Sequence, residues 1–262
     1  MAFVGILIIM MSAEAIWSRR QRAFDPLLRW PGNFGVAMLG NILIMLLLPV
    51  TAVGVALAVD ARGTGLLNML AIPPVIAIPA AMLLLDLLIY WQHRLFHRVP
   101  VLWRLHRMHH TDLEIDASTG LRFHPFELVI SMLIKLAAIA LLGAPALAVV
   151  LFEIILNACS VFNHANVRLP LRLDALIRKV IVTPDMHRVH HSAIPEETNS
   201  NFGFSLSVWD RLFGSYIAQP QLGHTDMEIG LAEYRDRTIL RPDRMLLDPF
   251  INPAERMGGE NT

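Results

Sequence analysis

The amino-acid sequence predicts an all-α integral membrane protein with about four transmembrane helical segments, including a helical hairpin, and a cytoplasmic helical cap. Of its 262 residues 55% are hydrophobic and only 17% are charged, and the mean hydropathy is +0.50, outside the usual range of soluble domains. The chain contains four long apolar stretches, residues 1–17, 35–59, 66–91 and 126–162. Each is near or above the length that crosses about 30 Å of hydrocarbon, which soluble core helices seldom reach.

The first three stretches are expected to be membrane spans. In residues 1–17 the arginines follow the apolar run, whereas in a secretory signal peptide the basic residues precede it, so we interpret this stretch as a retained anchor. A short link, Asp60 to Thr64, joins the second stretch to the third and contains a single basic residue, Arg62. We interpret this link as the outer turn between two spans.

The fourth stretch is expected to be a helical hairpin. Gly143-Ala144-Pro145 divides it into two halves of 17 residues, each about 25 Å long at 1.5 Å per residue, and a Gly-Ala-Pro sequence is typical of a turn. Each half is marginal for a full crossing, and both ends adjoin histidine-rich segments. A hairpin that enters and leaves the membrane on one side fits these lengths.

Basic residues predict the orientation. They gather after the first stretch and on both sides of the fourth, and by the positive-inside rule such segments face the cytoplasm. Lys plus Arg and Asp plus Glu are both 22, which gives a formal net charge of zero, so no basic field predicts a nucleic-acid partner. The basic groups are Arg19, Arg20, Arg22 and Arg29; Arg94, Arg98, Arg104 and Arg107; and Arg168, Arg172, Arg178 and Lys179.

Eight of the 11 histidines lie in three tight clusters. Side chains at positions i, i+3 and i+4 of a helix share one face, with Cβ atoms about 5–6 Å apart. Two or three imidazoles at this spacing are able to converge on one or two metal ions. The clusters are His93 and His97; His106, His109 and His110; and His187, His190 and His191.

Asp86 and Tyr90 extend the first cluster into one polar stripe on an otherwise apolar helix. An ionisable residue in a membrane span is unfavourable without a partner. Asp86 is expected either to orient a ligating imidazole, as outer carboxylates do at metal sites, or to bond a neighbouring helix.

The third cluster follows Thr183-Pro184-Asp185, the pattern of an N-cap, a first-turn proline and a carboxylate at the positive end of a helix. The remaining histidines stand alone, and a lone histidine is usually structural. His164 is expected to be a ligand because it lies where the hairpin rejoins the clusters, whereas His124 is left open and His224 is expected to lie outside the site.

The number of imidazoles indicates two metal ions, because a tetrahedral zinc accepts four ligands. The single cysteine, Cys159, excludes an intrachain disulfide and any CxxC metal or redox site. HExxH, GxSxG and phosphate-loop motifs are also absent from the sequence. Imidazole binds zinc, copper, iron and nickel alike, so the spacing leaves the metal open.

Two kinds of protein are compatible with these residues. The first is a dimetal enzyme, for example a zinc hydrolase or lyase that acts on lipid. The second is a membrane metal transporter, which needs ligands part-way through the bilayer and a path to both faces. The histidines gather on one side, so transport is the weaker of the two.

Six motifs, HRLFH, LWRLHRMHH, RFHPFE, FNHAN, TPDMHRVHHS and NFGFSLSVWDRLFGSY, occur in this order. In this they resemble the fatty acid hydroxylase/sterol desaturase superfamily of membrane di-iron enzymes. The resemblance covers about residues 86–216. It implies a division into N-terminal membrane anchor helices (1–85), a catalytic domain (86–216) and a cytoplasmic C-terminal tail (217–262).

The resemblance implies a ligand set of nine histidines. His124 matches the family's His-Pro element, whose role stays open. The FNHAN motif has one histidine where some fatty acid hydroxylases have an HxxxH pair, so either Asn163 replaces the missing ligand or that metal has an open position. Asp210 is expected to bond a ligating imidazole or, alternatively, to form a salt bridge or a turn. The implied ligands are His93, His97, His106, His109, His110, His164, His187, His190 and His191.

The resemblance also implies the chemistry. Two iron ions, for which zinc is a possible substitute, use O₂ as co-substrate to hydroxylate or desaturate a C–H bond of a lipid such as a fatty acyl chain or a sterol. The sequence has no flavin, nicotinamide or haem domain, so a separate reductase or ferredoxin-type electron donor is implied. The short loops favour a bacterial inner membrane, with the histidine site on the cytoplasmic face.

Overall fold

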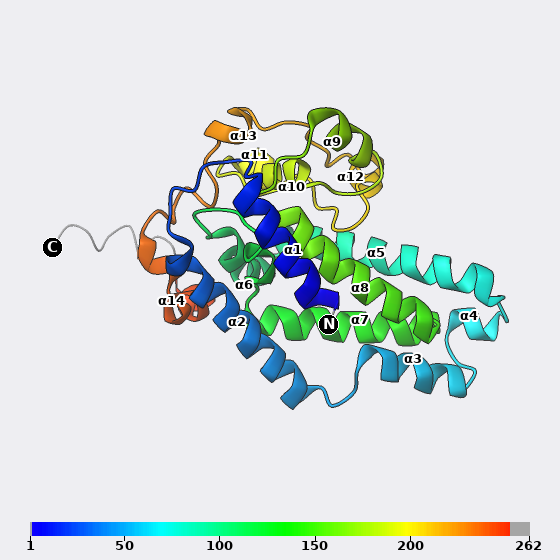
Figure 1. Ribbon diagram of the computed structural model, residues 1–262. Helices are drawn as coiled ribbons and strands as arrows, with labels where there is room; N and C mark the ends of the chain where they lie inside the picture. The colour runs from blue at the N-terminus through cyan, green and yellow to red at the C-terminus, as the bar shows by residue number, and fades with distance from the viewer. Residues whose placement is uncertain (1, 252–262) are drawn as a thin grey trace.

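The structure, a computed structural model that describes residues 2–251, is built from α-helices and short 3₁₀ turns (Figure 1). Within these residues it has no β-strand, and only three isolated β-bridges join loop segments. Four helical segments are long and apolar enough to cross a membrane by length and composition: Pro26–Met69, Pro74–Arg98, Pro125–Leu142 and Ala146–His164. The predicted all-α class and the number of about four such segments are therefore confirmed. The set differs from the prediction, because the stretch 1–17 forms a shorter apolar helix outside these four, while the two halves of the predicted hairpin supply two of them.

Proline fixes where many of the helices begin, because its ring presets a helical φ and its missing N–H is not needed in the first turn. Pro26, Pro74, Pro100, Pro125 and Pro184 are each the first residue of a helix. The apolar helices are α1 (Ala2–Ile16), α2 (Pro26–Leu47), α3 (Ala52–Ala61), α4 (Leu66–Met69), α5 (Pro74–Arg98), α7 (Pro125–Leu142) and α8 (Ala146–His164).

The helix boundaries differ from the predicted spans in two places. The stretch 35–59 is divided between α2 and α3, because Pro49 lies between them and the Thr51 side chain accepts a hydrogen bond from the Gly54 N–H to cap α3. The stretch 66–91 is divided between α4 and α5, and α5 continues to Arg98. The first cluster of histidines therefore occupies the last two turns of a long helix.

The predicted hairpin is confirmed. Helix α7 ends at Leu142, Gly143 takes a left-handed conformation with φ of 65°, and α8 begins at Ala146. Gly65, at φ of 84°, packs against this turn so closely that a Cβ there would lie 2.3 Å from the Gly143 nitrogen. The hairpin turn and the link before α4 are therefore in backbone contact.

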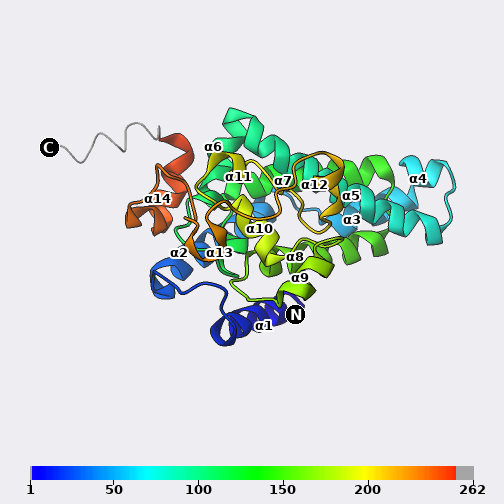
Figure 2. The ribbon, with the colours of Figure 1, turned by 90° about the horizontal axis from the view of Figure 1, so that it is seen from above.

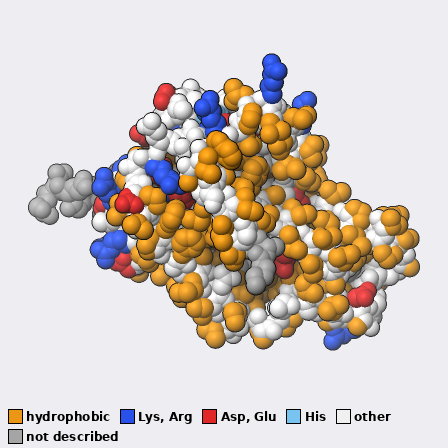
Figure 3. Space-filling view, viewed as in Figure 1, with side chains coloured by type: hydrophobic (Ala, Val, Ile, Leu, Met, Phe, Trp, Pro, Cys, Tyr) orange, Lys and Arg blue, Asp and Glu red, His pale blue; other side chains and the backbone are white. Residues whose placement is uncertain are grey.

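Helices α3, α5, α7 and α8 enclose the main apolar core. Small residues such as Ala52, Ala81 and Ala148 are fully buried there and allow the helices to approach closely. Helix α1, 15 residues long, packs along α8. Figure 3 shows hydrophobic side chains over most of the visible face, between charged groups on the upper left and a smaller charged group near the end of α3.

Short helices and loops form a cap over one end of the long helices (Figures 1 and 2). The segment 217–251 wraps around this cap, where the Arg107 Nε donates to the Asp248 carboxylate at 2.9 Å. Residues 252–262 of the predicted tail lie outside the described residues. The cap contains α6 (Pro100–His110), α9 (Leu171–Ile177), α10 (Pro184–His190), α11 (Pro195–Thr198), α12 (Val208–Leu212), α13 (Gly223–Asp226), α14 (Pro242–Leu247) and the 3₁₀ turns Thr119–Leu121, Arg237–Leu240 and Asp248–Phe250.

Candidate metal centre

The nine histidines of the predicted ligand set come together at one end of the long helices. Those of the first cluster lie in the last two turns of α5, those of the second lie on α6, and those of the third lie on α10 and at its C-cap. His164 is the last residue of α8. As predicted, Thr183 caps α10 by accepting from the Met186 N–H, with Pro184 in the first turn.

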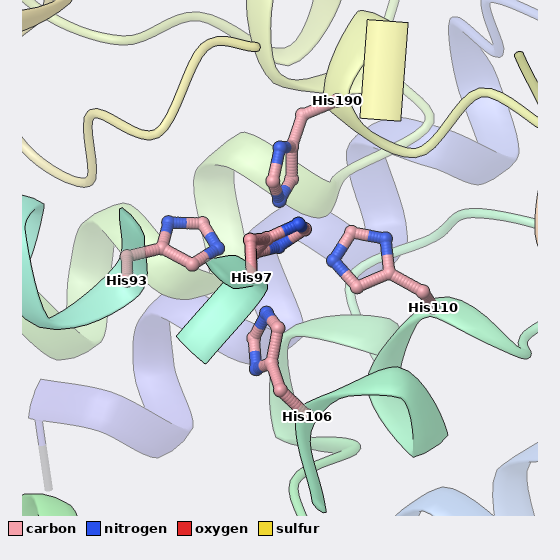
Figure 4. A group of neighbouring side chains, drawn as sticks. All are labelled: His93, His97, His106, His110 and His190. Carbon is pink, nitrogen blue, oxygen red and sulfur yellow. The ribbon is translucent and has the colours of Figure 1, made fainter. Parts of the chain in front are cut away.

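The nine side chains form two groups, in each of which the nitrogens that face one another lie within 4.8 Å. We call them the five-histidine group and the four-histidine group. Figure 4 shows the rings of the five-histidine group facing a common centre. The five-histidine group is His93, His97, His106, His110 and His190, and the four-histidine group is His109, His164, His187 and His191.

Helical periodicity is compatible with this division. In an HxxHH sequence the first and third histidines are one turn apart and project together, whereas the middle one projects to the side. On α6, His106 and His110 join the five-histidine group and His109 joins the other. On α10 the assignment is reversed, since His187 and His191 join the four-histidine group and His190 joins the five-histidine group. Each of the two HxxHH motifs therefore contributes two rings to one histidine group and one ring to the other.

Hydrogen bonds fix the tautomer of five rings. In each, Nδ1 lies close to an oxygen acceptor and so carries the proton, which leaves the lone pair of Nε2 directed into the cluster. Four of the acceptors are backbone carbonyls, and the fifth is a carboxylate. The pairs are His93 with Phe202 O (2.9 Å), His106 with Glu127 Oε1 (2.7 Å), His109 with Arg122 O (3.2 Å), His164 with Ser160 O (2.6 Å) and His190 with Ser200 O (2.7 Å).

These tautomers place lone pairs against lone pairs. The Nε2 atoms of His109 and His164 are 3.0 Å apart although Nδ1 carries the proton in both rings. In the five-histidine group the Nε2 atoms of His93, His106 and His190 are buried without a hydrogen-bond partner among the described residues. Converging, unpartnered imidazole nitrogens are unfavourable unless a cation lies between them. The residues present therefore fit metal ions in both groups.

Burial also keeps the rings in the ligating form. It lowers the pKa of His190 to about 3, and neighbouring imidazoles add to this effect. Burial, followed by repulsion from other rings, lowers the pKa of His109 and of His187 well below the usual value. Neutral imidazole is the form that binds metal.

Asp86 and Asp210 act away from the rings. Asp86 accepts hydrogen bonds from the Trp209 indole at 2.8 Å and from the Leu206 N–H at 3.2 Å, so it ties α5 to the cap, as the second of its two expected roles requires. Asp210 accepts from the Phe202 N–H at 2.7 Å and the Gly203 N–H at 2.8 Å. It thereby holds the loop whose Phe202 carbonyl orients His93.

The other two candidates, Asn163 and His124, lie at the edge of the site or beyond it. The Asn163 side chain donates to the Phe204 carbonyl at 2.6 Å. His124 is the N-cap of α7, where its Nδ1 accepts from the Phe126 N–H at 3.2 Å. His124 and His224 belong to neither histidine group.

Glu127 is a functional candidate that the sequence analysis missed. It lies in the first turn of α7, is 5% exposed, and accepts from His106. A buried carboxylate on a ligating imidazole is a common outer partner at metal sites. The signal in the sequence was an acidic residue at the start of an apolar stretch, in RFHPFE.

A buried ion network lies beside the C-terminal end of α6. Arg29 is 1% exposed and pairs with Asp112 and Asp116, each at 2.7 Å. Burial by itself raises the pKa of Asp112, but the adjacent Arg29 guanidinium lowers it to about 2. Arg122, fully buried, donates to the Met108 carbonyl at 2.9 Å. These contacts fix the end of α6 relative to α2.

A cavity of about 720 Å³ leads from the histidines into the membrane-spanning helices. Its walls include rings of both groups, among them His106 and His109. Most of the remaining lining is apolar, as in pockets that bury a ligand of this size. Apolar wall residues include Phe3, Leu7, Phe34, Met38, Leu128 and Phe204.

Fold and site together define a helical protein that combines four apolar segments long enough to cross a membrane with two buried groups of histidines that fit metal ions. The sequence profile of the fatty acid hydroxylase family matches residues 78–215, just over half of the chain. The chain therefore belongs to the fatty acid hydroxylase family, as its motifs predicted.

Several curated proteins are similar to this chain. The ornithine lipid hydroxylase OlsE of Rhizobium tropici is 31% identical over 144 residues, 54% of this chain and 42% of that protein. The human alkylglycerol monooxygenase is 29% identical over 146 residues, 53% of this chain and 30% of that protein. The fatty acid hydroxylase vlmA of a Lecanicillium species is 28% identical over 145 residues, 51% of this chain and 40% of that protein.

The chain thus covers less than half the length of each of these relatives. The comparison with solved structures gave no significant match.

Proposed function

We propose that this protein is a membrane-bound di-iron oxygenase that hydroxylates or desaturates a lipid. The observation that carries the proposal is the pair of buried histidine groups beside a largely apolar cavity within the membrane-spanning helices. The names of its relatives, a lipid hydroxylase and a monooxygenase, support the same reaction class.

In this proposal the nine histidines hold two iron ions, which supply O₂ activation for attack on a C–H bond. Histidine-only coordination suits iron, copper and zinc alike, so the choice of iron rests on the family. Glu127 orients His106, the Phe202 carbonyl orients His93, and the Ser160 carbonyl orients His164. The four-histidine group would offer its ion one imidazole fewer than the five-histidine group.

The protein's own residues control access to the centre. The cavity admits an acyl or sterol-like chain directly from the bilayer, and its apolar wall excludes water from the reacting carbon. The cap covers the opposite side. A separate reductase or ferredoxin-type donor supplies electrons.

The basic segments support a cytoplasmic position for the site and, for a bacterial protein, the inner membrane. Exposed Arg98, Arg168, Arg172 and Lys179 belong to those segments. Arg29 and Arg107, by contrast, are buried in ion pairs.

Metal content of the detergent-purified protein tests the proposal. We expect about two irons per chain, O₂ uptake with lipid and a reductant, and loss of activity in both His109→Ala and His190→Ala. Because His109 leaves three ligands in its group and His190 leaves four, His109→Ala is expected to lose its ion more readily. Two zinc ions after iron-replete expression favour a hydrolase or lyase instead, and the absence of stoichiometric metal refutes the dimetal centre.

A further inference from the structure

Two polar stripes cross the apolar hairpin and face the cavity. On α7 the polar residues recur every four positions, and on α8 they are four and three positions apart, so each set lies on one helix face. All of them line the cavity that begins at the histidines. The stripes are Glu127, Ser131 and Lys135 on α7, and Glu153, Asn157 and Ser160 on α8.

An ion pair joins the two stripes. The Lys135 ammonium donates to Glu153 Oε1 at 2.7 Å, and the two side chains are 12% and 30% exposed. Replacing such a pair by apolar residues is often neutral or stabilising, and a charged pair within a membrane span usually marks a functional site. Stabilising the hairpin therefore does not account for the position of this pair on the cavity wall.

The wall around the pair offers both donors and acceptors. The ammonium of Lys135 has three N–H donors, of which Glu153 accepts one. Nearer the histidines, Gln92 donates to the Ser131 hydroxyl at 2.9 Å, while the Gln92 Oε1 is buried without a partner among the described residues. A ligand group that both donates and accepts satisfies this wall.

The net charge of the ligand's polar group determines how well it fits this wall. Lys135 and Glu153 balance each other, so a carboxylate, phosphate or ammonium on the ligand would leave one net charge in a medium of low dielectric constant. An uncharged group avoids this penalty. The electrostatics and the hydrogen-bonding groups of the cavity therefore favour a hydroxyl or an amide.

The position of Lys135 on α7 gives the distance between the ion pair and Glu127. Lys135 is eight residues beyond Glu127, the residue bonded to His106, which corresponds to about 12 Å along α7 at 1.5 Å per residue. We propose that the cavity binds a lipid with an uncharged polar group, which Lys135 and Glu153 hold about 12 Å along α7 from Glu127, the partner of His106. This inference rests on the proposed function and names its substrate class.

Binding of four simple probes with the same chain length tests the inference: hexadecanol, hexadecane, hexadecanoate and hexadecylamine. The apparent Kd of each is measured from the rise in Tm of the full-length, metal-loaded protein in detergent. We expect hexadecanol to bind about tenfold more tightly than hexadecane, the effect of one or two net hydrogen bonds. The two charged probes are expected to bind more weakly than hexadecanol.

Variants of the pair separate the charges. Glu153→Gln leaves Lys135 unbalanced and should shift the preference to hexadecanoate, and Lys135→Met should shift it to hexadecylamine. The double variant Lys135→Met/Glu153→Leu should bind hexadecane as before and lose the preference for the alcohol. Arg241→Met/Asp243→Leu, which removes an exposed pair of 64% and 52% exposure, is the control.

An alcohol preference retained by the double variant, or a wild-type preference for a charged probe, overturns the inference. Because binding is measured without turnover, the two proposals fail separately. A protein that holds two irons and consumes O₂ without the alcohol preference refutes only the inference about the cavity. The preference in a protein without iron refutes only the proposed function.

Discussion

Replacing Glu127 tests whether the five-histidine group binds metal through His106. The two side chains meet at 2.7 Å and are 6% and 3% exposed, so the contact is almost free of solvent screening. Loss of such an outer partner typically weakens metal binding about 10- to 100-fold, or about 1.4–2.8 kcal/mol. Glu127→Gln keeps an acceptor oxygen and should lie near tenfold. Glu127→Leu leaves the His106 N–H unpaired and should approach a hundredfold.

Chelator competition on the iron-loaded protein provides the assay. Glu127 bonds to a ring of one group only, so one of the two ions should leave at about tenfold lower chelator concentration in Glu127→Gln, while the other is unaffected. Glu197→Gln is the matched control, because Glu197 is equally buried and accepts from the Gln221 backbone instead. Equal shifts of both ions, or no shift of either, would refute the assignment of His106 to a separate group.

Three further predictions concern stability in detergent. Arg29→Ala leaves two buried carboxylates without their cation and should lower the free energy of unfolding by about 3–5 kcal/mol. Arg241→Ala, at an exposed pair, should change it by less than about 1 kcal/mol. Equal effects of the two substitutions would contradict a stabilising role of the buried ion network. Gly65→Ala should lower Tm more than Gly63→Ala, because both glycines have positive φ but only Gly65 has backbone within reach of a Cβ. In the metal-free protein Tm should fall as pH decreases from 6.5 toward 3. The reason is that burial lowers the pKa of His190 to about 3 in the folded protein, so the unfolded chain takes up protons first. A Tm that does not change over this pH range would contradict the burial of these rings in neutral form.

Local sequence features were sufficient for the parts of the fold that depend on neighbouring residues. Gly143 marks the hairpin because only glycine readily takes the left-handed conformation of the turn, and Thr183 marks the start of α10 because its side chain satisfies a free N–H. Hydropathy, averaged along the chain, missed the break near Pro49, where the backbone leaves the helix while the composition stays apolar.

The buried polar groups were harder to predict. Arg29 appeared as one of the basic residues that fix orientation, but its partners, Asp112 and Asp116, lie far along the chain. Glu127 is likewise separated by 21 residues from His106. Such pairs form only when distant segments are brought together, so no local pattern indicates them.

For the histidines, too, the sequence predicts one part of the arrangement and only the tertiary structure decides the other. Their i, i+3 and i+4 spacing follows from the helix repeat, so the sequence by itself determined which rings share a helix face and that a multi-histidine centre was to be expected. Only the tertiary structure decided that His109 leaves its neighbours on α6 for the group of His187, and that His190 makes the reverse exchange. The physical reason is that spacing fixes directions around one helix axis, whereas the partition into two groups depends on how the axes of α5, α6, α8 and α10 are packed.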